Sequence, residues 1–99
     1  MKAILHIKPG TFTARPSPYR ILRDGFCLMI IDDRAAQGYV LSREQDLSIL
    51  RLCGLPLTES ALEAYYVDDR SQVNLPSDEW IIEYCILKAI IPHPVEEYG

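Results

Sequence analysis

Long hydrophobic runs are absent from this sequence of 99 residues. The longest uninterrupted apolar stretch, Phe26–Ile31, is far shorter than the roughly 20 residues that a membrane-spanning helix needs. The N-terminal segment 1–8 has a basic start, but its apolar part alternates and ends at Lys8-Pro9, too short for the core of a secretory signal. We therefore expect neither a membrane-spanning segment nor export.

Cysteine and histidine are scarce. Three cysteines, Cys27, Cys53 and Cys85, lie far apart without CxxC spacing, which fits neither a disulfide framework nor a zinc site. Each lies in an apolar run, so we predict reduced core residues in a cytoplasmic protein. The two histidines, His6 and His93, have no partner at metal-ligand spacing. We expect no metal and no cofactor.

The known motifs of catalysis are also missing. The sequence contains no G-x-S-x-G elbow, no phosphate-binding P-loop and no dinucleotide-binding G-x-G-x-x-G. Its adjacent acids, such as Asp32-Asp33, are typical of solvated turns and helix caps rather than of an acid/base pair in a pocket. We predict a protein that is not an enzyme; a small enzyme whose site involves Cys27, His6 or Asp33 is the alternative.

What the sequence does contain is the composition of one small globular domain over residues 1–99, with 48% hydrophobic and 24% charged residues, which argues against disorder. Its first half favours strands. We predict a strand over residues 2–8, a β-hairpin over 19–32 with a type I′ turn at Asp24-Gly25, and a short strand at 39–41. The apolar second arm of the hairpin suggests a central strand that is covered on both faces.

The second half favours helices. Ser42 and Gln45 form a capping-box pattern before a helix that ends at Gly54. A helix from Thr58 is preferred over a short hairpin at 65–74, and a last helix runs from Ser77 to about Ile91. We therefore predict an α+β fold with a small antiparallel sheet of three to four strands, packed by two to three helices from the C-terminal half.

Charge is distributed unevenly along the chain. Residues 1–51 carry eight Lys or Arg against five Asp or Glu, whereas residues 52–99 carry two against nine. Such a field steers association with a partner of opposite charge. We predict that the chain binds a basic protein, with a nucleic-acid-binding protein as one candidate class. The contacting residues would be Glu59, Glu63, Asp68, Asp69, Asp78, Glu79 and Glu83.

Other functions are weighed against this one. Lys8, Arg15, Arg20 and Arg23, interleaved with Phe12 and Tyr19, resemble a single-strand-binding surface, but an acidic chain repels nucleic acid, so direct binding is not expected.

The last helix is apolar on most of its circumference, which suggests a homodimer or an assembly subunit as the main alternative. Small acidic proteins without catalytic motifs also serve phages and mobile elements as inhibitors, including inhibitors of CRISPR complexes. This analogy rests on size and charge alone.

Overall fold

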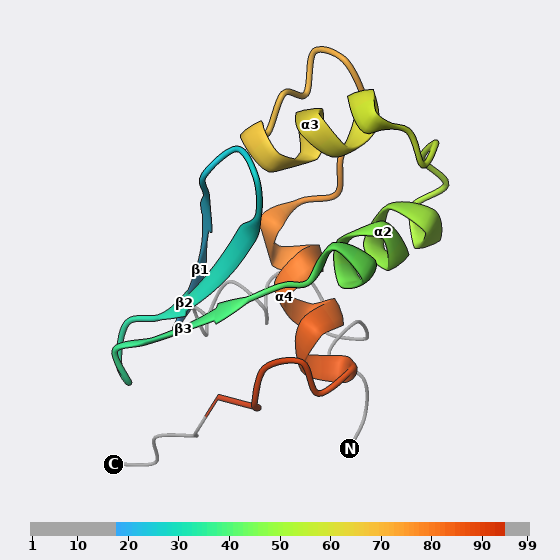
Figure 1. Ribbon diagram of the computed structural model, residues 1–99. Coiled ribbons are helices and arrows are strands. Elements are labelled where there is room, and N and C mark those ends of the chain that lie inside the picture. The colour runs from blue at the N-terminus through green and yellow to red at the C-terminus, as the bar shows by residue number, and fades with distance from the viewer. Residues whose placement is uncertain (1–17, 95–99) are drawn as a thin grey trace.

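The computed structural model describes residues 18–94, in which three strands precede three helices. The strands β1 (Tyr19–Arg23), β2 (Leu28–Asp32) and β3 (Gln37–Val40) form an antiparallel sheet in the order β1-β2-β3, so β2 is central (Figure 1). The predicted α+β class is confirmed. The strand predicted over residues 2–8 lies outside the described residues.

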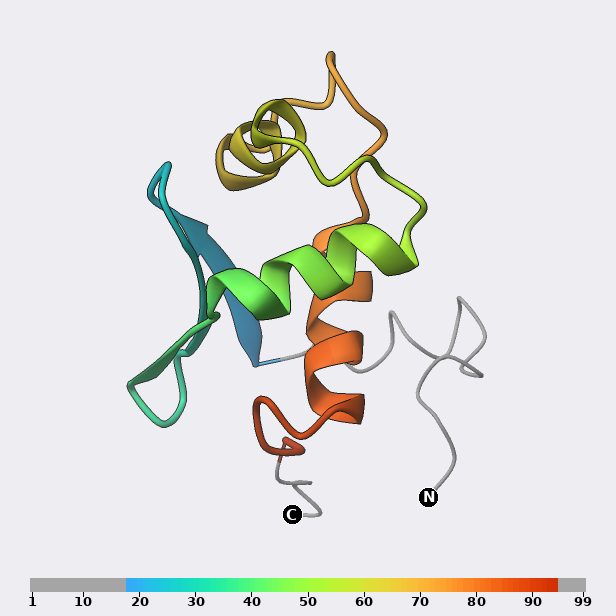
Figure 2. The ribbon, with the colours of Figure 1, turned by 45° about the vertical axis from the view of Figure 1, so that its right-hand side comes forward.

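Three helices follow, and each begins after a hydroxyl residue. The helices are α2 (Arg43–Leu52), α3 (Glu59–Val67) and α4 (Asp78–Leu87). α4 lies beside the sheet, and α2 begins near the sheet and crosses α4 (Figure 2). The side chain that precedes each helix accepts a hydrogen bond from a backbone N–H of the first turn, and these side chains are Ser42, Thr58 and Ser77. The predicted capping box is present in α2, and the helical prediction for α3 is confirmed.

The hairpin turn is longer than predicted. Arg23 pairs with Leu28, so four residues, 24–27, connect the strands. Gly25 has a φ of +90°, but Asp24 does not have the positive φ that a type I′ turn requires. Instead the Asp24 carboxylate accepts hydrogen bonds from the backbone N–H groups of Phe26 and Cys27, both at 2.8 Å. This side-chain cap stabilises a wider loop than the two-residue turn that the sequence suggested.

The last helix ends earlier than predicted, at Leu87 rather than near Ile91. Ala89 has a φ of +60°, and the backbone N–H of Ile90 donates to the carbonyl of Cys85 at 2.8 Å. This is a Schellman ending with alanine in the left-handed position where glycine is usual. The chain reversal returns Ile91 to the core, where it is 1% exposed, and this burial offsets the cost of the strained alanine.

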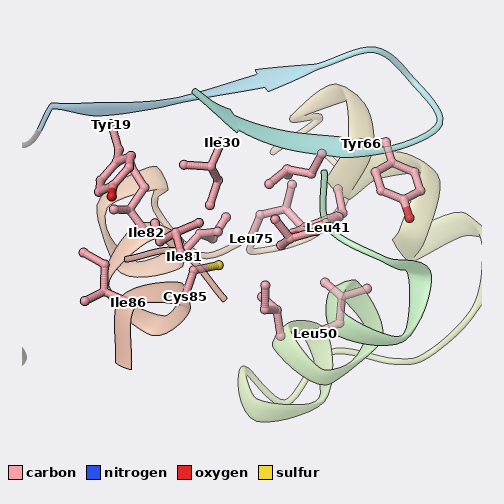
Figure 3. Close-up of a cluster of buried hydrophobic side chains, with 14 of the residues drawn as sticks. Tyr19, Ile30, Leu41, Leu50, Tyr66, Leu75, Ile81, Ile82, Cys85 and Ile86 are labelled. Carbon is pink, nitrogen blue, oxygen red and sulfur yellow. The ribbon is translucent and has the colours of Figure 1, made fainter. Parts of the chain in front are cut away.

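The core lies between one face of the sheet and the helices. Tyr19 and Ile30 point from the sheet toward Ile81, Ile82 and Cys85 of α4 (Figure 3). Leu41, Leu50, Tyr66 and Leu75 extend the same cluster toward α2 and α3. α4 therefore buries much of its apolar surface within its own chain.

The other face of the sheet carries an apolar row. Leu22 lies opposite Met29, and Met29 lies opposite Val40, so these three side chains share the face turned away from the core. Leu22 is 47% and Val40 60% exposed, whereas Met29 is partly buried. The position of β2 as the central strand is confirmed. Within residues 18–94 the helices pack on one of its faces, so the described part of the chain does not show the cover that was expected on the second face.

Candidate partner-binding surface

Two of the predicted acidic residues form ion pairs at the two ends of α3. The Glu59 carboxylate accepts a hydrogen bond from Arg43 at 2.6 Å, and the Asp68 carboxylate forms an ion pair with Arg70, with a nitrogen–oxygen distance of 2.7 Å. All four side chains are more than 40% exposed, so each pair stabilises the fold by at most about 1 kcal/mol. Their main effect is to neutralise charge locally. Arg43 is 16 residues from Glu59, a pairing that local spacing on one helix does not reveal.

Asp78 is held by an arginine that the sequence analysis placed on the surface. Arg23 extends from β1 with a side chain that is 12% exposed, and it donates to Asp78 at 2.9 Å and to the backbone carbonyl of Tyr65 at 3.1 Å. It therefore joins β1 to the last turn of α3 and the first turn of α4. Arg70 lies 4.0 Å from the same carboxylate of Asp78. Asp78 thus has a structural role.

Glu63 and Asp69 line an open hollow beside α3. The hollow has a volume of about 640 Å³, with Ala64, Val67 and Val73 among its lining residues. Asp69 accepts hydrogen bonds from the backbone N–H and the hydroxyl of Ser71, at 3.2 and 2.6 Å. Within residues 18–94, no arginine or lysine pairs with either carboxylate.

Glu79 and Glu83 lie four residues apart on α4, where adjacent helical turns place their side chains side by side. Burial and, secondarily, the neighbouring Glu79 carboxylate raise the pKa of Glu83. Neither glutamate has a cationic partner among residues 18–94. Lys88, the cation on this segment, is nine residues from Glu79, which is about two and a half turns and therefore the opposite side of the helix.

Two aromatic side chains accompany these glutamates. Trp80 and Tyr84 each follow a glutamate by one residue, and their rings stack with centroids 5.5 Å apart and planes 6° from parallel. Both are partly buried, and Leu87, three residues after Tyr84, is 51% exposed. From the sequence, these residues were expected to belong to an apolar helix that other parts of the protein or a second chain must cover. Both rings pack against the core cluster while part of each side chain stays exposed. The four-residue spacing of the acids and of the aromatics was the signal that the members of each pair lie side by side on the helix.

A buried carboxylate was missed altogether. Asp46 of α2 is 0% exposed and accepts hydrogen bonds from the hydroxyls of Tyr65 at 3.1 Å and Tyr66 at 2.8 Å. Burial raises its pKa from 3.8 to about 6, although the two tyrosine hydrogen bonds oppose the rise. The three groups connect α2 to α3 in the protein interior. They form a structural contact, because each of them is buried.

The basic and aromatic surface considered from the sequence does not form in the part that the structure describes. Tyr19 is 6% exposed and donates its hydroxyl to the Pro92 carbonyl at 2.6 Å, and Arg23 points inward. Arg20 is exposed but pairs with Asp33 at 2.8 Å. Lys8, Phe12 and Arg15 lie outside the described residues.

The cysteines show no sign of an activated thiol. Cys85 is buried as predicted, but Cys27 and Cys53 are only partly buried, because they lie in a hairpin loop and at a helix end. Burial raises the pKa of all three, to about 12 for Cys85, which disfavours the reactive thiolate.

In the range 18–94, no group of three or more His, Cys, Asp or Glu side chains is arranged to hold a metal ion. No helix in that range has the length and apolar character needed to cross a bilayer. Comparison of the chain with protein families, curated proteins and solved structures finds no match.

Proposed function

We propose that the protein is a non-catalytic binding protein whose acidic C-terminal half contacts a basic partner protein. The observation that carries the proposal is the pair Glu79 and Glu83 on α4, two neighbouring carboxylates without a cationic partner in the described chain. Their repulsion destabilises the helix by a few tenths of a kcal/mol. A cation supplied by a partner relieves it. Glu63 and Asp69, at the hollow beside α3, add two further carboxylates that have no arginine or lysine partner among residues 18–94.

The other three predicted contacts contribute less to this surface. Glu59, Asp68 and Asp78 already have arginine partners, so their fields are partly cancelled before any partner arrives. In the proposal, Glu79 and Glu83 form the centre of the contact, and Glu63 and Asp69 contribute long-range attraction.

We further propose that binding inhibits the partner. Carboxylates that occupy a nucleic-acid-binding groove compete with phosphates for the same lysines and arginines. On the basis of its charge and small size, the protein is proposed as a phage or mobile-element inhibitor of a nucleic-acid-guided defence complex, such as a CRISPR complex. The corresponding test is competition: the protein should displace a labelled oligonucleotide from the partner protein, once that partner has been isolated by affinity capture on this chain.

The charge argument is tested by the kinetics of binding to the captured partner. The double substitution Glu79→Lys and Glu83→Lys should slow association by roughly tenfold at low salt, because it reverses the steering field, and the difference should shrink at high salt. Glu44→Lys, which reverses an exposed acid on α2, is the control and should change the rate much less. An unchanged association rate in the double variant would remove the α4 glutamates from the proposal.

Self-association is a second candidate function, and the surface that favours it is the open face of the sheet rather than the last helix. α4 buries much of its apolar surface against its own chain, whereas the row Leu22, Met29 and Val40 on the sheet is partly open. A homodimer would pack two such sheet faces together. Light scattering coupled to size exclusion measures the mass: a dimer that Val40→Glu converts to a monomer supports this candidate, and a monomer at high concentration excludes it.

A further inference from the structure

The outward face of α4 combines two features that one type of side chain satisfies together. Its acidic pair, Glu79 and Glu83, runs alongside the stacked rings of Trp80 and Tyr84, and we call these four residues the α4 strip. We propose that the α4 strip docks an arginine side chain of the basic partner. The inference rests on the function proposed above and specifies the chemical group that the surface recognises.

The carboxylates supply the first half of this recognition. Glu83 is partly buried beside Glu79, and a guanidinium between them would form charge-assisted hydrogen bonds while relieving their mutual repulsion. Because a planar fork of N–H groups matches a carboxylate in two places, arginine fixes its orientation there, whereas a lysine ammonium acts as a point charge.

The aromatic pair supplies the second half. A guanidinium stacks on aromatic faces and is attracted by the negative ring face, an interaction stronger for tryptophan than for tyrosine or phenylalanine. The rings of Trp80 and Tyr84 stack nearly parallel, and each follows one of the two acids by one residue. Both side chains pack against the core and remain partly exposed, so part of the aromatic pair is open to a partner. Aromatic residues are also enriched at the centres of protein interfaces. The charge of the acids attracts lysine and arginine alike, and contact with the adjacent rings is what adds the higher affinity for arginine.

Leu87 extends the contact at the C-terminal end of the strip. It is 51% exposed and lies four residues after Glu83, on the same side of the helix. In the partner, an apolar side chain next to the docked arginine would cover Leu87. We therefore expect the α4 strip to bind a segment of the partner protein in which an arginine is adjacent in sequence to an apolar residue.

Two labelled peptides of equal charge test the inference. One repeats Gly-Arg-Leu three times, and the other replaces each arginine by lysine. Fluorescence anisotropy should show affinity for the arginine peptide that is about two- to five-fold higher, the ratio expected from a cation–π contact at an exposed site. Trp80 is the sole tryptophan, so its emission reports directly on the strip and should shift more with the arginine peptide.

Single substitutions show which residues of the α4 strip produce the preference for the arginine peptide. Trp80→Leu should abolish the preference for arginine while leaving charge-driven affinity for both peptides, and Tyr84→Leu serves the same purpose if the first variant does not fold. Glu83→Gln should weaken binding of both peptides. Tyr84→Phe keeps the ring and should keep the preference, and Glu44→Gln on α2 should change nothing.

Failure of the arginine inference can be distinguished from failure of the acidic-surface proposal. Equal affinity for the two peptides, or a preference that survives both Trp80→Leu and Tyr84→Leu, overturns the arginine inference and leaves the acidic-surface proposal in place. Absence of saturable binding of the arginine peptide up to about 1 mM also overturns the inference, because such a contact would be too weak to guide recognition. The acidic-surface proposal then stands or falls on the association kinetics of Glu79→Lys and Glu83→Lys with the captured partner.

Discussion

Replacement of the buried Asp46 by asparagine should make the protein more stable at neutral pH. The pKa of Asp46 rises from 3.8 to about 6 on folding, mainly because its carboxylate is buried. Between these pH values the native state binds a proton that the unfolded state has released, so the free energy of unfolding falls as pH rises. The stabilising contribution is complete below pH 3.8 and is lost as pH rises through 6.

The expected change in stability of Asp46→Asn follows from the pKa shift of Asp46. About two pKa units correspond to about 3 kcal/mol at 1.4 kcal/mol per unit. Asp46→Asn avoids burying a charge, but the amide cannot accept hydrogen bonds from both Tyr65 and Tyr66 as well as a carboxylate does, which costs about 1 kcal/mol. We therefore expect the variant to be about 1–2 kcal/mol more stable at pH 7.5. At pH 4 it should be slightly less stable than the parent.

Urea unfolding followed by circular dichroism at intervals from pH 4 to pH 8 measures this directly. The difference in unfolding free energy between variant and parent should change by about 2–2.5 kcal/mol across this range, and subtraction cancels the contributions of the other carboxylates. Tyr66→Phe is the control: it removes one donor to Asp46 and should destabilise the protein more at pH 7.5 than at pH 4. A difference between Asp46→Asn and the parent that is independent of pH would refute the reasoning.

Further predictions concern backbone strain and the inward-pointing Arg23. Ala89→Gly should raise the free energy of unfolding by about 0.5–1 kcal/mol, because glycine relieves the strain of alanine in the left-handed conformation. Gly54 occupies the equivalent position after α2, and Gly54→Ala should lower the free energy of unfolding by about 1 kcal/mol. A Cβ at Gly54 would meet no atom within 4 Å, so it would add backbone strain without any new packing. Thermal unfolding checks both, and a loss of stability in Ala89→Gly would contradict the Schellman assignment. Arg23→Met should cost about 2–3 kcal/mol, since it removes the hydrogen bonds to Asp78 and to the Tyr65 carbonyl and leaves Asp78 the longer contact with Arg70. The loss should persist in 1 M salt, and a loss below about 0.5 kcal/mol would reduce Arg23 to a surface pair.

Local patterns predicted much of the fold. The capping box of Ser42 and Gln45 and the cap at Thr58 marked the starts of α2 and α3, because a cap depends on residues three positions apart. The end of α4 was missed because alanine, unlike glycine, carries no signal for a left-handed position. Its conformation is imposed by burial of Ile91, a tertiary effect.

The electrostatic arrangement was harder to predict, since it depends on contacts between distant segments. Asp46 resembled an ordinary acid in the first turn of a helix, and its tyrosine partners lie 19 and 20 residues away. Arg23 was read as a surface cation because its inward direction follows from the register of β1 with β2 and from the position of Asp78, 55 residues later. The acids on α4 were predicted, whereas the aromatic stack beside them required the structure.

The central claim, that the acidic surface binds a basic partner, is tested most directly by affinity capture from a lysate of the native host at low and at moderate salt. The parent is compared with a variant in which Glu63, Asp69, Glu79 and Glu83 are replaced by their amides. The account predicts a basic protein that the parent retains at low salt and releases at moderate salt, and that the variant fails to retain. Equal recovery of the same protein by parent and variant, or recovery of the chain itself alone, would contradict it.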